Sequence, residues 1–318
     1  MASNDSVSDS VRLAAEALAS GHLVAFPTET VYGLGADATH AVAVARIFEV
    51  KGRPLSHPLI LHLSSIDELG RWAEGIPEYA LRLAGAHSPG PLTLILWKSA
   101  ATSPLVTGGQ DTVGIRVPSH PLAQELLLEF ASAGGSGAVA APSANRFGRV
   151  SPTTAEAVRA ELAHRLNPGD HILDGGACAI GLESTIVDCT GDRPSIARPG
   201  AVTSAMVERA TGLEPVPFTH HVRVSGALKS HYAPRAELVI DSEARPGDGF
   251  IALSTHPTPP GAHRLLTPAD AEAFAFGLYE ALREGDRRGL SRVVAILPDG
   301  DGLAAAVRDR LSRAASGH

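Results

Sequence analysis

Short, strongly apolar segments that alternate with helical segments place the tightest limit on the fold of this chain. Five of them are too apolar to have one face in water, and they span residues 22–28, 59–63, 92–97, 112–117 and 138–142. Apolar residues elsewhere recur at helical spacing, as in Ser10–Ala19, where Gly21 follows as an expected helix end. Strands that are buried on both faces need helices to cover them. The pattern therefore predicts an α/β fold, with a sheet packed by helices.

The chain has 318 residues, enough for about two domains. Residues 214–235 carry prolines, histidines and small residues without a clear period, so we interpret them as a linker between domains at 1–213 and 236–318. The last segment has the order strand, strand, helix, strand, helix, which predicts a small Rossmann-like domain. In the first domain we expect helices near 40–50, 66–73, 77–86, 121–132 and 154–164, and further strands near 171–174 and 184–188.

Charge and cysteine usage exclude several classes of protein. The net charge of −7 argues against a broad basic face for nucleic acid, so any anionic ligand must be held by a local basic cluster. Cys178 and Cys189 have no metal or redox spacing, which favours a reduced, cytoplasmic compartment. The acidic N-terminal segment does not resemble a signal peptide, and no apolar run reaches the roughly 20 residues that span a bilayer.

Two motifs in the first third of the chain place polar and basic side chains beside strands. PTETVYGLGADA (27–38) carries two threonines, a glutamate and a tyrosine before a predicted Gly-x-Gly turn, and it forms either a polar shelf for a ligand or an ordinary strand-to-helix turn. In KGRPLSHPLILHL (51–63), Lys51 and Arg53 either neutralise a polyphosphate or form a solvated basic turn. His62 is either a core histidine or a ligand contact.

Two later motifs add hydroxyl, amide and guanidinium groups at strand ends. AAPSANRFGRVSPTT (140–154) runs from a strand to a helix start, which suits an anion but also fits ordinary loop and capping chemistry. GLESTIVD (181–188) and ARPG (197–200) lie on another pair of strand ends. Ligands of α/β sheets collect at such ends. The side chains of interest are Ser143, Asn145, Ser151, Ser184, Thr185 and Arg198.

Other familiar motifs are missing or out of context. The sequence has no phosphate-binding P-loop, no His-Glu-x-x-His and no Gly-x-Ser-x-Gly. Residues 135–140 match a Gly-x-Gly-x-x-Ala dinucleotide pattern, but they follow a helix and lead into a strand, which is the wrong order. The pair His220–His221 lacks an evident third metal ligand, and Asp299–Asp301 is too short for a calcium loop.

In this order, PTETVYGLG, KGRP, PSAN, ESTIVD and RPG resemble the signatures of the YrdC-like threonylcarbamoyl-AMP synthase family over about residues 8–210. SGALKSHYAP and the C-terminal segment resemble the longer, two-domain form. The resemblance implies a YrdC-like twisted mixed sheet with helices and an open ligand cavity. It implies that threonine contacts Thr30, His62, Arg116, Ala141 and Ser184. It implies that ATP contacts Arg53, His57, Thr112, Ser143, Asn145, Ser151, Arg198 and Tyr232.

The resemblance also implies a reaction, in which threonine, bicarbonate and ATP give threonylcarbamoyl-AMP and pyrophosphate. We expect Lys51 and Arg53 to stabilise the developing charge, with Mg²⁺ bound by the ATP phosphates and not by protein side chains. A separate tRNA threonylcarbamoyl transferase would use the product, and direct tRNA binding would be weak. Position 57 departs from the asparagine expected in many relatives. The competing hypothesis is an RNA-binding module that uses the basic cavity without chemistry.

Overall fold

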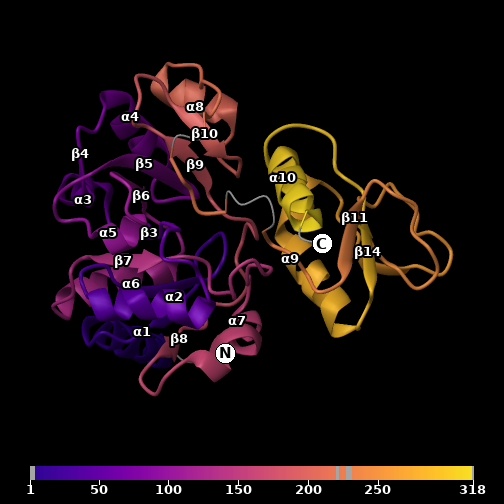
Figure 1. Ribbon diagram of the computed structural model, residues 1–318, viewed down its shortest axis with the longest axis horizontal. Helices are drawn as coiled ribbons and strands as arrows, with labels where there is room; N and C mark the ends of the chain where they lie inside the picture. Colours follow the sequence, from indigo (N-terminus) through magenta and orange to yellow (C-terminus); the bar gives the residue numbers. More distant parts are fainter. Residues whose placement is uncertain (1–3, 220–221, 227–230, 317–318) are drawn as a thin grey trace.

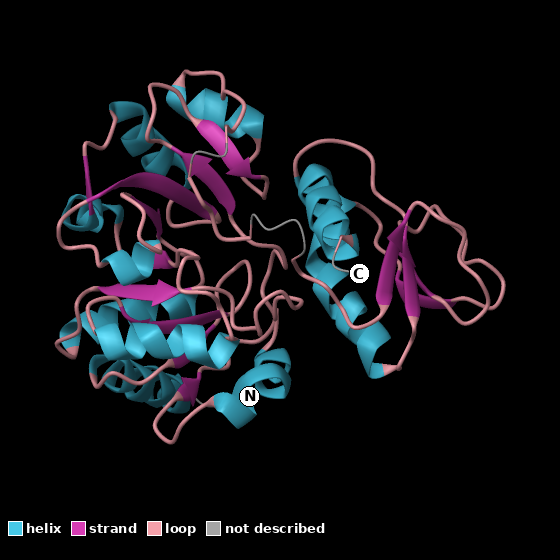
Figure 2. Cartoon of the chain, viewed as in Figure 1, coloured by secondary structure: helices cyan, strands magenta, loops and turns pink. Residues whose placement is uncertain are grey.

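The computed structural model describes residues 4–219, 222–226 and 231–316, and Figure 1 shows two lobes side by side. The first lobe contains a mixed sheet covered by helices, and the second contains a smaller sheet with two helices (Figure 2). The predicted α/β class of both parts is confirmed. None of the helices in these three ranges combines the length and apolar content that crossing a bilayer demands.

The first lobe holds these elements. Its strands are β1 Val24–Phe26, β2 Gly33–Asp37, β3 Ile60–Leu63, β4 Ala73–Glu74, β5 Leu92–Lys98, β6 Thr112–Arg116, β7 Ala138–Ala141, β8 His171–Ile172, β9 Thr185–Asp188 and β10 Ser195–Arg198. Its helices are α1 Asn4–Ala19, α2 Ala41–Lys51, α3 Leu69–Trp72, α4 Glu78–His87, α5 Pro104–Thr107, α6 Pro121–Ser132, α7 Ala155–Leu162 and α8 Ser204–Thr211, with short 3₁₀ turns η1 Ile66–Glu68 and η2 Ala163–Arg165.

The strands of the first lobe join in the order β10-β9-β5-β6-β3-β7-β2-β1-β8, with β4 paired to β5. Parallel and antiparallel pairs alternate through the centre: β3 runs parallel to β6 and antiparallel to β7, and β5 runs antiparallel to β6 and parallel to β9. Side chains of a strand alternate between the two faces of a sheet. Each central strand therefore contributes to two different environments.

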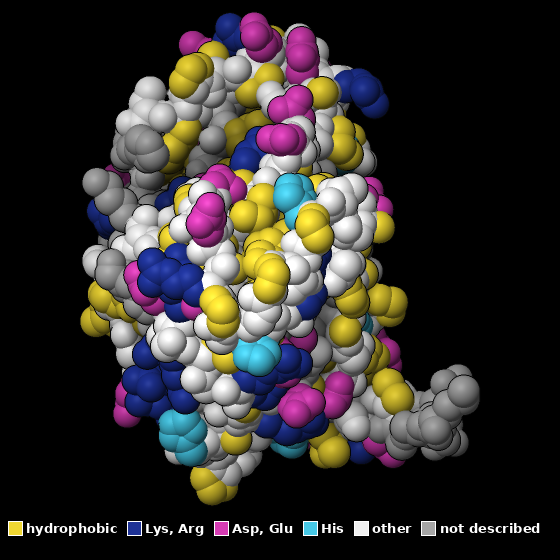
Figure 3. Space-filling model, turned by 90° about the vertical axis from the view of Figure 1, so that its right-hand side faces the viewer, with side chains coloured by type: hydrophobic (Ala, Val, Ile, Leu, Met, Phe, Trp, Pro, Cys, Tyr) yellow, Lys and Arg dark blue, Asp and Glu magenta, His cyan; other side chains and the backbone are white. Residues whose placement is uncertain are grey.

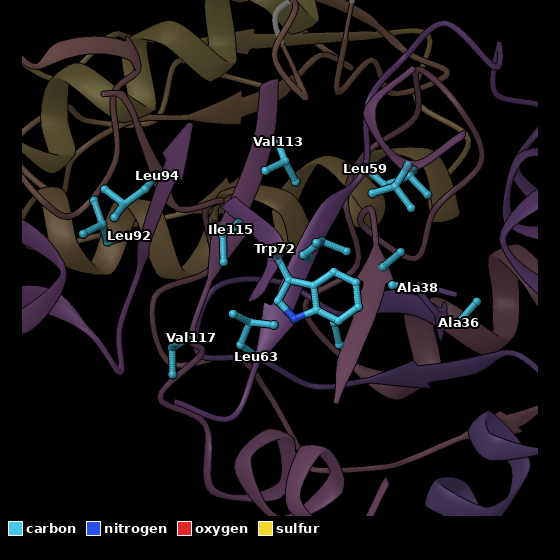
Figure 4. Packing of buried hydrophobic residues seen from close by; sticks show 14 of the residues in the cluster. Ala36, Ala38, Leu59, Leu63, Trp72, Leu92, Leu94, Val113, Ile115 and Val117 are labelled. Atoms are coloured by element: carbon cyan, nitrogen blue, oxygen red, sulfur yellow. The ribbon is translucent and has the colours of Figure 1, made fainter. Parts of the chain in front are cut away.

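One face of the sheet forms the main apolar core with α2, α4, α7 and α8. Trp72, only 1% exposed, lies amid the aliphatic side chains of this core (Figure 4). On the other face, α1 and α6 cover the β1 and β7 end of the sheet through a second cluster that includes Phe26 and Phe130. The second cluster contains no residue of the central strands β3 and β6, so α1 and α6 do not cover this face of those two strands.

The prediction of a Gly-x-Gly turn at 33–35 is wrong, because these residues belong to strand β2, all of which is buried. A Cβ atom on Gly35 would lie 2.5 Å from Val139 Cγ1 of the neighbouring strand β7, so glycine is needed here for close packing. The other expected helices and strands of the first lobe are present within a few residues of their predicted bounds. Elements β4, α5 and α8 were not predicted, and of β10 only its end at ARPG was inferred.

The second lobe has strands β11 Glu237–Ile240, β12 Gly249–Ile251, β13 His263–Leu266 and β14 Arg292–Ala295, and helices α9 Ala271–Arg287 and α10 Leu303–Ala315. Its four strands are all parallel, in the order β11-β14-β12-β13. In Figure 1, α9 and α10 lie on the side of the sheet that faces the first lobe. The apolar core of this lobe takes in Val31, Val150 and Leu182 of the first lobe, so the two lobes pack against each other.

Candidate active site

The alternation of side chains along the central strands creates the candidate site. On β3, Leu61 and Leu63 enter the main core, so His62 points to the opposite face. On β6, Val113 and Ile115 enter the same core, and Arg116 pairs in register with His62. A histidine and an arginine from neighbouring strands therefore share the face that the helices of the main core do not cover.

A small pocket lies over this face. Five chain segments beyond the two strands contribute to it: the turn after β1, the turn after α2, the loop after β7, the segment around β9 and β10, and the linker. Its lining consists of Thr28, Val31, Tyr32, Gly33, Arg53, Ile60, His62, Arg116, Ala141, Pro142, Ser143, Glu183, Ser184, Arg198, Ser225, Gly226, His231 and Tyr232. Its volume of about 50 Å³ holds only a few water molecules.

Eight of the fourteen residues predicted for the site line this pocket. They are Arg53, His62, Arg116, Ala141, Ser143, Ser184, Arg198 and Tyr232. Thr30, Lys51, Asn145 and Ser151 lie immediately behind the lining and bond to residues in it. His57 and Thr112 lie farther away. The structure therefore gathers most of the predicted site, in two layers.

At one end of the pocket, Arg116 is held by side chains of the PTET segment. Its Nη1 donates to Thr30 Oγ1 at 2.8 Å, and Thr28 Oγ1 lies 2.8 Å from the same hydroxyl oxygen. Arg116 Nη2 lies 2.7 Å from Glu29 Oε1, but the two atoms are not aligned as a hydrogen bond. The guanidinium is thus fixed and charge-compensated while keeping donor capacity.

His62 is buried beside Arg116 and packs edge-on against Phe26, with ring centroids 5.6 Å apart. Burial lowers the pKa of His62 to about 3, and the Arg116 charge acts in the same direction. The imidazole is therefore neutral at pH 7 and available as a hydrogen-bonding group.

Lys51 and Arg53 are both buried, at 2% and 7% exposure, which excludes the solvated basic turn. Gly52 ends α2 between them. Lys51 Nζ donates to the backbone oxygens of Ser143 and Asn145, the first at 2.6 Å, so it braces the loop after β7 from beneath. Burial, followed by the positive charge of Arg53, lowers the pKa of Lys51 well below its usual value.

Arg53 reaches the pocket wall, where its Nη2 donates to Pro58 O at 2.8 Å and to Ser225 Oγ of the linker at 3.2 Å. Its Nε is buried and has no partner among the described residues. Burial lowers the pKa of Arg53 to about 10, which still leaves the guanidinium charged at pH 7. An unsatisfied donor on a fixed cation is a suitable partner for an anionic ligand.

Arg198 forms a bridge between the ESTIVD segment and the linker. Its Nε donates to Ser184 O at 3.0 Å, its Nη2 to Ser184 Oγ at 3.1 Å and its Nη1 to Ser225 O at 3.0 Å. Ser184 Oγ also lies 2.7 Å from Thr93 Oγ1 on β5. The third basic side chain of the pocket is therefore positioned by both of its neighbours.

The linker forms a cover over the pocket, which we call the strap (residues 222–226 and 231–232). Val222 and Val224 pack on Ile95 and Ile186 of the sheet. Tyr232 is 1% exposed and has a φ of +64°, an unusual backbone conformation for a tyrosine that is typical of functional segments. Its hydroxyl has no hydrogen-bond partner in the described part of the chain. The pair His220–His221 and Lys229, the lysine of SGALKSHYAP, lie outside the described residues.

The remaining predicted residues have supporting positions. Asn145 Nδ2 donates to Arg146 O and Arg149 O, and Ser151 Oγ donates to Glu183 Oε1 at 2.6 Å. Thr112 lines a smaller neighbouring cavity. His57 packs edge-on against Phe147, and burial, followed by the charge of Arg53, lowers the pKa of His57.

Sequence reasoning missed several lining residues, above all Glu183. This residue lies within the ESTIVD motif, directly before Ser184, but nothing in the local sequence distinguishes it from a surface glutamate. Ser225 and Gly226 of the linker were also not singled out, whereas Thr28 and Tyr32 belong to the polar shelf that PTETVYGLGADA suggested. In the described part of the chain, histidine, cysteine and carboxylate side chains form no group of three or more that could hold a metal ion.

Comparisons with known proteins agree with this arrangement. A family model described as "Telomere recombination" matches residues 16–200, and one described as "Threonylcarbamoyl-AMP synthase, C-terminal domain" matches residues 202–316. The threonylcarbamoyl-AMP synthase of Pyrococcus abyssi is 39% identical over 97% of this chain and 94% of its own length. That of Bacillus subtilis is 38% identical over 96% and 92%.

The solved structures give the same result. The crystal structure of P. abyssi Sua5 complexed with L-threonine superimposes with a TM-score of 0.86 at 36% identity, over 96% of this chain and 94% of that one. The Escherichia coli YciO structure shares the fold over 60% of this chain, with a TM-score of 0.51 at 24% identity. The chain therefore belongs to the two-domain threonylcarbamoyl-AMP synthase family.

Proposed function

We propose that this protein is an enzyme that joins L-threonine, bicarbonate and ATP into threonylcarbamoyl-AMP and releases pyrophosphate. The observation that carries the proposal is the convergence of Arg53, Arg116 and Arg198, from three separate motifs, on one pocket. ATP, the threonine carboxylate and bicarbonate are all anions. The net charge of the chain is −7, so such a concentration of arginine is local and specific.

Arg116 is the proposed partner of the threonine carboxylate. Its planar guanidinium can bind a carboxylate with two parallel hydrogen bonds. Thr30 and Glu29 hold it in place, and neutral His62 beside it can exchange a hydrogen bond with the substrate without adding charge. Ala141 and Ser184 complete the proposed threonine end.

ATP is proposed to occupy the side of the pocket formed by Arg53, Ser143, Arg198 and Tyr232, with Mg²⁺ entering on its phosphates. Lys51, Asn145 and Ser151 support this side from behind through the contacts described above. His57 and Thr112 stay predictions for the outer part of the nucleotide. The 50 Å³ pocket is far smaller than the roughly 300 Å³ or more of typical ligand sites, so the strap must move outward to admit the substrates.

The proposed chemistry has two steps. The threonine amine attacks bicarbonate, and loss of water gives the carbamate. A carbamate oxygen then attacks the α-phosphorus of ATP, a new P–O bond forms, and the bond to the β-phosphate breaks to release pyrophosphate. Catalysis is mostly positioning and charge neutralisation, for which Arg53 and Arg198 are the proposed groups, with Lys51 behind them. Because carbamates are short-lived in water, the strap's second proposed role is to exclude water.

The competing function is an RNA-binding module without chemistry. On the face shown in Figure 3, side chains of Lys and Arg are interspersed with Asp and Glu, and no single charge dominates. RNA-binding surfaces are typically extended and basic, and this face is not of that kind. The net charge of −7 also weighs against an RNA-binding surface. The product is proposed to pass to a separate tRNA threonylcarbamoyl transferase in the cytoplasm.

Pyrophosphate release tests the proposal. We expect release only when ATP, threonine and bicarbonate are all present with Mg²⁺, and omission of any one substrate should reduce it to background. Equal release without threonine would contradict the proposed reaction.

A further inference from the structure

A buried hydrogen-bonded ion pair joins the C-terminal domain to the pocket wall. Glu183 lies on the loop before β9, and its Oε2 accepts hydrogen bonds from Tyr279 Oη of α9 at 2.8 Å and from Arg310 Nε of α10 at 2.9 Å. Arg310 Nη2 also donates to Pro199 O at 3.0 Å. Arg310 is fully buried and Glu183 is 6% exposed, so both charges are removed from water.

Glu183 is itself part of the pocket lining. Burial alone would raise the pKa of Glu183, but the charges of Arg310 and Arg198 and the hydrogen bonds outweigh it and hold this pKa at about 2. Glu183 is therefore a carboxylate at neutral pH. It also accepts the Ser151 hydrogen bond, so it links the C-terminal domain to the loop that follows Asn145.

The same two residues of the C-terminal domain also hold Tyr232 of the strap. The Tyr232 ring stacks on the Tyr279 ring, with centroids 5.7 Å apart and planes 25° apart. The central guanidinium carbon of Arg310 lies 5.6 Å from the centroid of the Tyr232 ring. Two side chains thus hold two separate lining residues, Glu183 and Tyr232.

An interdomain contact that is only structural does not need buried charges, since apolar side chains of similar size serve as well or better. The interface already has such an apolar part in Val31, Val150 and Leu182, which pack into the core of the C-terminal domain. The more deeply buried ion pair, Glu183 with Arg310, occurs where the interface meets the pocket, whereas the interdomain pair Arg283–Glu161 is more exposed and does not line the pocket. This placement argues for a role in the pocket itself.

We propose that Tyr279 and Arg310 are positioning residues that set the ATP side of the pocket through Glu183 and Tyr232, so that the docked C-terminal domain completes the nucleotide site. The inference rests on the proposed function for the assignment of that side to ATP. It gives the C-terminal domain a defined role, because Tyr279 and Arg310 contact both Glu183 and Tyr232.

The test compares full-length variants by direct binding. Tyr279→Phe removes one hydrogen bond to Glu183 and keeps the ring that stacks on Tyr232. Arg310→Met removes the positive charge. Arg310→Lys keeps the charge but lacks the planar guanidinium group and its several N–H donors. Arg283→Met is the matched control, because Arg283 of α9 is also an arginine at the interface but contacts Val150 O and Glu161 instead. Calorimetry gives the Kd of a non-hydrolysable ATP analogue with Mg²⁺ and, separately, that of threonine.

We expect Arg310→Met to weaken analogue binding about tenfold or more and Tyr279→Phe about threefold, with partial recovery in Arg310→Lys and threonine binding within about twofold of wild type. Arg283→Met should lower Tm without changing analogue affinity. Wild-type analogue affinity in folded Tyr279→Phe and Arg310→Lys would overturn the inference, and so would equal weakening of both ligands. Absence of binding of both ligands to the wild-type protein would instead contradict the proposed function. The failure of the inference can therefore be distinguished from the failure of the proposed function.

Discussion

Gly226 lies where the strap crosses the pocket, and a single methyl group there tests the closed arrangement. Its φ is +81°, and a Cβ atom would lie 2.2 Å from Tyr232 Oη and 3.0 Å from Arg198 Nη1. Alanine in the left-handed region costs about 1–2 kcal/mol. Crowding of a well-packed site costs about 1–3 kcal/mol more. Gly226→Ala should therefore lower the free energy of unfolding by about 2–5 kcal/mol, or displace Tyr232 from the pocket wall and weaken ATP binding.

Gly212 provides the matched control, since its φ is +72° and a Cβ atom there would meet nothing within 4 Å. Gly212→Ala should show only the backbone cost of about 1–2 kcal/mol, with normal kinetics. Tyr232→Phe removes the atom at 2.2 Å and leaves Cζ at an ordinary 3.4 Å. Adding it to Gly226→Ala should therefore recover about 1–3 kcal/mol.

The measurements are urea unfolding and the KM for ATP, made on the wild type, the single variants and the double variant. Equal effects of Gly226→Ala and Gly212→Ala would show that the strap does not cross the pocket as described. The same conclusion follows if Tyr232→Phe does not relieve the Gly226→Ala defect.

Three further predictions concern the pocket. Arg53→Ala should lower ATP affinity about tenfold or more in a binding titration, and it should also lower Tm because Arg53 is buried; an unchanged Kd would remove it from the ATP site. His62 and His231 have pKa values of about 3 against a usual 6.5, so they bind fewer protons when folded, and stability should fall below pH 6.5. Each buried histidine lowers the free energy of unfolding by about 1.4 kcal/mol at about pH 5.5. Tm should therefore be lower at about pH 5.5 than at about pH 7.5, and the difference should be smaller in His62→Gln. An equal difference in the wild type and in His62→Gln would contradict this. Valine should be rejected about 10⁴-fold and serine about 10–200-fold in kcat/KM, and comparable use of valine would show that the threonine hydroxyl is not recognised.

Much of this site could be predicted because many of its residues lie at the ends of strands. His62, Arg116 and Ser184 lie on or beside strands that apolar runs reveal, and the alternation of each strand determines which face its side chains share. Strand β2 could not be recognised in this way, because Gly33 and Gly35 suggest a turn whereas their actual role is close packing against Phe26 and Val139.

The contribution of the C-terminal domain depends on tertiary contacts that no local pattern encodes. Glu183 and Arg310 are 127 residues apart in sequence, and neither lies in a segment with unusual composition. The burial of Lys51 could not be predicted either, because its spacing from Arg53 fits an exposed turn as well as a buried side chain that supports a loop. Domain bounds at 213 and 235 stay predictions, although Val222 and Val224 pack on the catalytic sheet.

One pocket is proposed to join three substrates into one product. The most direct measurement is mass spectrometry of the nucleotide products after incubation with ATP, Mg²⁺, ¹³C-bicarbonate and ¹⁵N-threonine. The proposed reaction predicts a single adenylate that carries both labels, formed in equal amount to pyrophosphate. Labelled threonine on an adenylate without the bicarbonate carbon, or ADP and AMP with neither label, would contradict it.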